Sequence, residues 1–153
     1  MYLSCDMWDL LELFDKHGVM YMLVGGHAVN YYGYVRTTQD IDILVYPSVK
    51  NAQAIMKALG EFGFAGAGIP REYFERVGSA VHLGVEPNRI DLLTHLGSGV
   101  SNDTLFKNKR RVELQGEQID IISLEDLIRV KRSSSRLRDQ ADAQELEKTG
   151  RDE

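Results

Sequence analysis

The stretch VGGHAVNYYGYVRTTQDIDILV, residues 24–45, decides the fold of this chain. It starts at the end of an apolar segment, passes through a glycine pair and an arginine-threonine segment, and ends in an apolar segment with two aspartates. We interpret it as a strand end, a turn into a short helix, a loop and a second strand. Because side chains alternate across a strand, Asp40 and Asp42 should share one face, with Cα atoms about 6.5 Å apart.

Two carboxylates on one face can converge on one metal ion. Mg²⁺ prefers oxygen ligands and usually keeps places for water and for substrate phosphate. A third carboxylate would complete a two-metal arrangement, with ions roughly 3.5 to 4 Å apart. Asp91 is the preferred candidate, because an acid inside the apolar segment 89–93 is either buried at a cost or bound to a cation. Asp120, which alternates with Ile119 and Ile121, competes for this role.

Both motifs could also have a purely structural role, with no part in ligand binding. An Asp-x-Asp pair is often the solvated face of an edge strand, and a glycine pair is often a tight turn. Here the two motifs are close together, and a second acid-bearing strand follows, which favours a binding site. Gly25 and Gly26 let the backbone approach a ligand closely, and the helix start after them offers N–H groups to phosphate.

Arg36 lies between the glycine pair and the aspartates. Its planar guanidinium matches the oxygens of a phosphate, so it is a candidate phosphate clamp. It could equally pair with Asp40 or Asp42 and neutralise them. The local sequence leaves both readings open. Thr38, in the same loop, is a further candidate phosphate ligand.

These motifs resemble a known superfamily. Gly25-Gly26, then Asp40-Ile41-Asp42 after thirteen residues, and a later lone Asp91 in a strand are similar to the nucleotidyltransferases, of which DNA polymerase beta is the best-known member. Residues 24–45 look most like small bacterial nucleotidyltransferases related to the AbiEii toxins of toxin-antitoxin and phage-defence systems. Segments 123–131 and 136–142 fit the same group, so the resemblance spans about residues 20–147.

The resemblance implies a two-metal enzyme that uses Mg²⁺ or Mn²⁺. Such an enzyme moves a nucleoside monophosphate from a nucleoside triphosphate (NTP) to a hydroxyl group of an acceptor, here a tRNA or a protein. Asp40, Asp42 and Asp91 would hold the metal, with Asp91 as general base. A cognate toxin or antitoxin partner is also implied.

The resemblance further implies which residues bind the nucleotide. Lys131 would contact phosphate, with the region of Asp139 and Asp142 holding that lysine in place. Many members have Ser at the second position of the glycine pair, where this chain has Gly26, so backbone N–H groups, helped by His27, must take over its role. The expected phosphate-binding residues are Gly25, Gly26, His27, Arg36, Thr38 and Lys131.

Two other functions compete with transfer. The chain could be a non-catalytic nucleotide-binding or antitoxin-like partner, which the missing serine at Gly26 supports. It could also be a metal-dependent phosphohydrolase, in which the carboxylates activate water. The absence of a His-Asp metal pair in the sequence counts against the hydrolase.

Composition sets outer limits. With 153 residues, 43% of them hydrophobic, the sequence suits one globular domain, 1–153, with a core at about 20–122 and a C-terminal helical segment at 123–148. No membrane-spanning run or signal pattern occurs, and a single cysteine, Cys5, cannot form an internal disulfide, so we expect a cytoplasmic protein. A net charge of -5 argues against binding nucleic acid by electrostatics alone.

Basic residues nevertheless form two clusters. One contains Lys107, Lys109, Arg110 and Arg111, and the other Arg129, Lys131, Arg132, Arg136 and Arg138. Each cluster is either a solvated face or a counter-charge for a nucleotide or RNA.

The remaining pattern predicts an α/β (α+β) fold, a mixed sheet flanked by helices and followed by C-terminal helices. Before the first strand, 21–24, a helix is expected over 6–17, with Asp6 as N-cap. The expected elements after residue 45 are a helix from Ser48 to about Phe62, a loop at 63–70, a hairpin of 80–85 with 89–93, a polar connection after 97–99, a hairpin of 111–114 with 118–122, a helix capped by Ser123, and a last helix.

Overall fold

The computed structural model describes residues 3–38, 40–63 and 68–150. Within them, one mixed sheet has the strand order β3-β4-β2-β1-β6-β5. Both expected hairpins are present, since β3 pairs with β4 and β5 pairs with β6 in antiparallel fashion. The strands are β1 (Tyr21–Val24), β2 (Ile41–Val45), β3 (Ala80–Leu83), β4 (Ile90–Leu93), β5 (Arg110–Leu114) and β6 (Glu117–Ile121).

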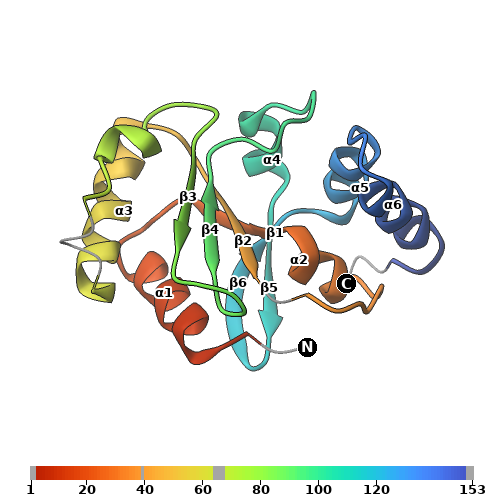
Figure 1. The fold of residues 1–153 in the computed structure, drawn as a ribbon, viewed down its shortest axis with the longest axis horizontal. Helices are drawn as coiled ribbons and strands as arrows, with labels where there is room; N and C mark the ends of the chain where they lie inside the picture. Colours follow the sequence, from red (N-terminus) through yellow and green to blue (C-terminus); the bar gives the residue numbers. More distant parts are fainter. Residues whose placement is uncertain (1–2, 39, 64–67, 151–153) are drawn as a thin grey trace.

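Helices flank this sheet, as the sequence predicts. In Figure 1, α1 and α3 lie at the left of the sheet, while α5 and α6 lie at its right, and the members of each pair pack against each other. None of the described helices is long and apolar enough to span a membrane. The helices are α1 (Cys5–Lys16), α2 (Gly25–Tyr31), α3 (Val49–Phe62), the 3₁₀ helix η1 (Arg71–Phe74), α4 (Asn102–Asn108), α5 (Leu124–Arg132) and α6 (Leu137–Thr149).

The two central strands, β1 and β2, are almost completely buried. Every residue of β1 is buried, and in β2 only Asp42 has partial exposure. Such apolar runs are typical of strands covered on both faces. β2 runs antiparallel to β1 but parallel to β4, which brings Asp42 level with Asp91 on the neighbouring strand. The register of these strands therefore sets the position of the site.

Three local predictions need correction. The first helix is capped by Ser4, whose hydroxyl accepts the N–H of Met7, so Asp6 lies inside the helix and not at its cap. The polar connection contains a helix, α4, which has only seven residues and shows little periodicity in sequence. Asp40 precedes β2 and does not belong to it. In the expected loop at 63–70, residues 64–67 lie outside the described residues.

Candidate active site

Three carboxylates meet at one end of the central strands. Asp42 on β2 and Asp91 on β4 occupy paired positions of the parallel ladder, and Asp40 immediately precedes β2. All three line a cavity of about 550 Å³. Burial, together with repulsion from Asp91 and Asp40, raises the pKa of Asp42 to about 6, although Lys131 acts in the opposite direction. The folded protein therefore concentrates negative charge here, where a cation would relieve it.

Asp91 already has basic partners. The Arg89 guanidinium donates two hydrogen bonds to it, from Nε to Oδ1 at 2.9 Å and from Nη2 to Oδ2 at 3.1 Å. His82 Nδ1 lies 2.6 Å from the same Oδ1, and Arg89 Nη2 also lies 3.3 Å from Asp40. The cationic partner that Asp91 requires in apolar surroundings is thus Arg89. Strand alternation places residues 89 and 91 on one face, and this signal was available in the sequence.

Two of these carboxylates fit a divalent metal. Among the described residues, the buried Oδ1 of Asp40 has no hydrogen-bond partner, and Asp42 carries a charge that burial disfavours. Oxygen atoms of this kind are the ligands that Mg²⁺ and Mn²⁺ accept. Across the residues that the structure describes, no set of three or more His, Cys, Asp or Glu side chains is already arranged around a metal position. Arg89 and His82 instead lie within hydrogen-bond distance of the oxygens of Asp91.

A buried carboxylate holds the cations on the other side of the cavity. Asp142, 1% exposed, accepts hydrogen bonds from Nε and Nη2 of Arg36, both at 2.9 Å. Lys131 Nζ lies 2.9 Å from Asp139 and 3.2 Å from Asp142. Arg36 therefore pairs with Asp142, and the expected alternative of pairing with Asp40 or Asp42 is wrong. Asp142 fixes both Arg36 and Lys131 at the cavity wall.

The glycine pair packs directly against other residues of the site. A Cβ on Gly25 would lie 2.3 Å from Oδ2 of Asp42, and its φ of +70° also disfavours any other residue. A Cβ on Gly26 would lie 2.5 Å from Oγ1 of Thr38. The Thr38 hydroxyl thus fills the space that a serine at position 26 would need. The expected role of His27 at the phosphate does not fit its position, because His27 is 4% exposed and does not line this cavity.

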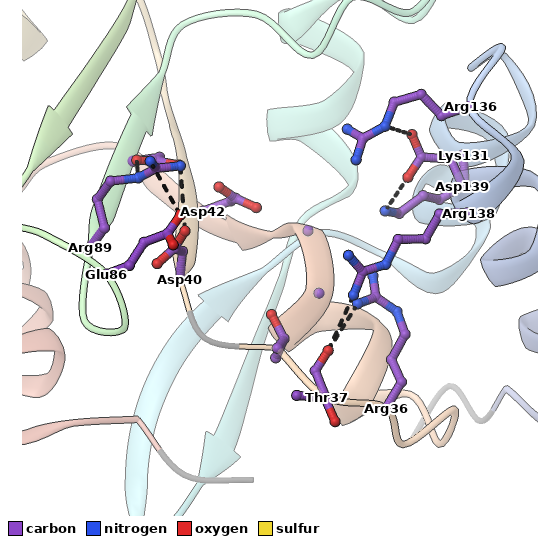
Figure 2. A pocket seen from close by; sticks show the side chains of 14 residues that line it. Arg36, Thr37, Asp40, Asp42, Glu86, Arg89, Lys131, Arg136, Arg138 and Asp139 are labelled. Carbon is purple, nitrogen blue, oxygen red and sulfur yellow. Dashed lines mark hydrogen bonds and ion pairs between the residues drawn. The ribbon is translucent and has the colours of Figure 1, made fainter.

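Arginines from the second basic cluster surround the cavity. Figure 2 shows Asp40 and Asp42 near Arg89, with Lys131, Arg136 and Arg138 across the cavity. Arg138 also donates a hydrogen bond to the backbone carbonyl of Thr37. The acidic half and the basic half of the cavity therefore face each other, as a metal-bound polyphosphate requires.

The first basic cluster has a different role. Lys109 Nζ lies 2.6 Å from Asp120, and Arg111 lies 3.0 Å from its other oxygen. Arg111 also forms two hydrogen bonds to Asp15 of α1. Asp120 does not line the cavity, so it is not the third carboxylate of the site. This network ties the β5–β6 hairpin to α1.

A match to a protein-family model places the protein among the nucleotidyltransferases. The chain belongs to the family described as "Nucleotidyl transferase of unknown function (DUF2204)", whose model matches residues 4–152. A comparison with curated proteins finds no significant match. The similarity to AbiEii-related proteins that the sequence suggests stays a prediction.

Solved structures share the fold. The lincomycin-bound lincosamide antibiotic adenylyltransferase LnuA superposes with a TM-score of 0.57 at 19% identity, covering 96% of this chain and 98% of that one. A nucleotidyltransferase, TM1012, from Thermotoga maritima gives 0.58 at 18% identity, covering 93% and 88%. An antigenic nucleotidyltransferase-like protein from Paracoccidioides brasiliensis gives 0.53 at 16% identity, covering 94% and 78%. At such identities the similarity concerns the fold alone.

Proposed function

We propose that this protein transfers a nucleoside monophosphate from an NTP to a hydroxyl group, with a divalent metal, Mg²⁺ or Mn²⁺, as cofactor. One observation carries the proposal. Asp42 and Asp91 lie side by side on parallel strands, with Asp40 next to them, and the same cavity presents Lys131 and several arginines opposite. Acids that hold metal and bases that hold phosphate are the two parts that phosphoryl transfer needs.

Asp40 and Asp42 would hold the metal, and Asp91, whose oxygens accept hydrogen bonds from Arg89, would lie beside them as the base. When bound, the metal neutralises charge on the phosphates and favours ionisation of the acceptor hydroxyl. The acceptor oxygen bonds to the α-phosphorus while the bond to the bridging oxygen breaks, and pyrophosphate leaves with the electron pair. Asp91 takes the acceptor proton. Arg89, bound to both oxygens of Asp91, keeps that carboxylate in place during transfer.

The basic half of the cavity would bind the phosphates that leave. Lys131 and Arg36 are held rigidly by Asp142, so their positive charges are pre-positioned before an NTP arrives. Backbone groups of Gly25 and Gly26 can approach the phosphates closely, because neither residue has a side chain. Thr38 would add its hydroxyl at the same place. Together these groups stabilise the charge that develops on pyrophosphate.

The acceptor we propose is a hydroxyl on tRNA or on a protein, and the protein would then act as the toxin of a toxin-antitoxin pair. Only the similarity of residues 24–45 to toxin-related nucleotidyltransferases supports this part. LnuA, by its name, adenylylates a lincosamide antibiotic, so small hydroxyl compounds belong in the same test. The Thr38 hydroxyl above Gly26 weakens the case for a non-catalytic partner, which rested on the missing serine.

The decisive experiment incubates the protein with Mg²⁺ and each α-labelled NTP in turn. Total tRNA, cell extract and a set of hydroxyl-bearing small molecules serve as acceptors. The Asp40→Ala/Asp42→Ala variant is the inactive control, and Asp120→Asn, a carboxylate outside the cavity, is the matched control that should keep activity. Label on an acceptor with wild type and Asp120→Asn alone supports the proposal. Release of free nucleotide without a labelled acceptor would favour the phosphohydrolase instead.

A further inference from the structure

A second cavity, of about 470 Å³, adjoins the first. The two share Gly25, Asp42, Lys131, Arg136 and Asp139, so they meet at the carboxylates and at the lysine. The second cavity runs from the end of β4 to α5 and the turn that follows α5.

Its lining differs in chemistry from that of the first cavity. Among the described residues that line the first cavity, none has an apolar side chain. The second cavity has an aliphatic wall and, beyond it, three consecutive serines. The wall is formed by Val24, Leu93, Leu96, Leu127 and Val130, and the serines are Ser133, Ser134 and Ser135.

An NTP is likewise divided into a charged part and a partly apolar part. Its triphosphate is highly charged, whereas its base has apolar faces and hydrogen-bonding edges, and the α-phosphate joins the two halves. The charged cavity matches the triphosphate and the aliphatic cavity matches the base, with the shared Asp42 at the junction. A volume of about 470 Å³ lies in the range of small-molecule sites.

The serines indicate how the base is read. Ser133 Oγ donates its hydrogen to the carbonyl of Val130 at 2.7 Å, and Ser134 Oγ donates to Asp139 at 2.7 Å. Ser134 Oγ also accepts the N–H of Arg136 at 3.1 Å, so it keeps one lone pair as an acceptor, while Ser133 Oγ also remains an acceptor. Adenine, guanine, cytosine and uracil each carry at least one N–H group on the pairing edge, so each can donate to such an oxygen. The aliphatic wall adds contact area but discriminates only weakly by shape.

We propose that the second cavity binds the nucleoside part of the NTP and selects weakly among the four bases. This inference rests on the proposed function, since it assigns a place to the donor of that reaction. Wild-type affinities for the four NTPs should then lie within about tenfold of one another, because every base can donate an N–H group to the serine oxygens and the aliphatic wall discriminates only weakly by shape.

Leu96→Trp tests the assignment by filling the cavity from its partly exposed wall. Leu114→Trp makes the same exchange at a partly buried leucine of β5 outside both cavities and serves as the matched control. Calorimetry with Mg²⁺ measures the affinity for each NTP and for tripolyphosphate, which has no nucleoside. We expect Leu96→Trp to weaken all four NTPs by at least about tenfold and to change tripolyphosphate binding by less than about twofold. Leu114→Trp should change neither.

The other outcomes separate this inference from the function it rests on. If wild type binds NTPs and Leu96→Trp binds them equally well, the nucleoside lies elsewhere. If Leu96→Trp keeps NTP affinity but loses transfer, the cavity holds the acceptor. A preference of wild type for one base by more than about a hundredfold overturns the weak selection. A wild type that binds tripolyphosphate and none of the NTPs overturns the proposed function itself.

Discussion

The hydroxyl oxygen of Thr38 lies 2.5 Å from the position that a Cβ on Gly26 would occupy. Residues 26 and 38 therefore exclude each other: a side chain at one position requires a smaller residue at the other. We predict that Gly26→Ser and Thr38→Gly each weaken NTP binding by about tenfold or more, the value of a hydrogen bond to a charged group. The double variant Gly26→Ser/Thr38→Gly should regain most of the affinity, because the new serine has space and supplies the hydroxyl.

Gly99→Ser is the control for the glycine-to-serine exchange, since no described residue has an atom within 4 Å of a Cβ on Gly99. It should bind NTPs like wild type. Additive losses in the double variant at positions 26 and 38 would refute the exchange of roles. NTP titrations of all four variants decide the matter.

Asp142 should be among the most important residues for stability. It is 1% exposed and bonded to Arg36 and Lys131, so Asp142→Ala leaves cations without their buried partner. We expect a loss of about 3–5 kcal/mol in the free energy of unfolding, measured by urea denaturation. Asp15→Ala breaks a partly exposed pair with Arg111 and should cost about 1 kcal/mol or less.

Replacing the ion pair by apolar residues separates its structural role from its binding role. Arg36→Met/Asp142→Leu should recover much of the stability that Asp142→Ala loses, because no charge remains buried without a partner. Its affinity for NTPs should stay low, since Arg36 no longer supplies a positive charge. A double variant that binds NTPs like wild type would show that Arg36 has only a structural role.

Asp42 predicts a dependence of stability on pH in the metal-free protein. Its pKa is raised from 3.8 to about 6 on folding, so between these values the folded state binds more protons than the unfolded state. The contribution of Asp42 is therefore most favourable at low pH and is lost as pH rises through about 6. Asp42→Asn should be more stable than wild type at about pH 7.5, and this difference should shrink at about pH 4.5.

The measurement is urea denaturation in the presence of a chelator. In separate samples without chelator, Mg²⁺ should stabilise wild type and have a much smaller effect on Asp42→Asn, because the carboxylate that binds the ion in the folded state has been removed. If the variant were less stable than wild type at the higher pH, Asp42 would not carry an unfavourable buried charge. Such a result would also remove one reason for placing a metal there.

Arg89 should affect the chemical step more than NTP binding. It holds both oxygens of Asp91, so Arg89→Ala frees the proposed base and we expect kcat to fall by about tenfold or more, with little change in KM for the NTP. Arg89→Lys should lie between wild type and Arg89→Ala, because an ammonium group cannot make the two parallel bonds. Arg71→Ala, which breaks a surface pair with Glu75, is the control.

Removal of Arg89 should lower kcat but strengthen the binding of Mg²⁺. Its positive charge lies 3.3 Å from Asp40 and repels any cation there, so Arg89→Ala should need less Mg²⁺ for half-maximal activity. Lower kcat together with tighter metal binding is a signature that simple unfolding cannot produce. A parallel rise in the Mg²⁺ requirement would instead make Arg89 part of the metal site.

Several features follow from the sequence alone. The apolar run of 21–24 and the alternation around Asp42 predict their strands, and both hairpins form as predicted. Ser123 caps α5 by accepting the N–H of Asp126. These predictions succeed because strand alternation and capping depend on a few neighbouring residues. The first helix cap was missed because several polar residues compete for that position, and α4 was missed because it has only seven residues and little periodicity.

Only the tertiary structure decides which distant residues meet. It selects Asp91 over Asp120 because β4, and not β6, pairs with β2. It pairs Arg36 with Asp142, which lies 106 residues further along the chain. It also packs the hydroxyl of Thr38 against Gly26. The physical reason is that strand order and register depend on how the whole core packs, so no local pattern contains them. The sequence by itself thus identified the Asp40-Asp42 and Gly25-Gly26 motifs as candidate site residues. The packing of the whole chain determined which other residues contact them.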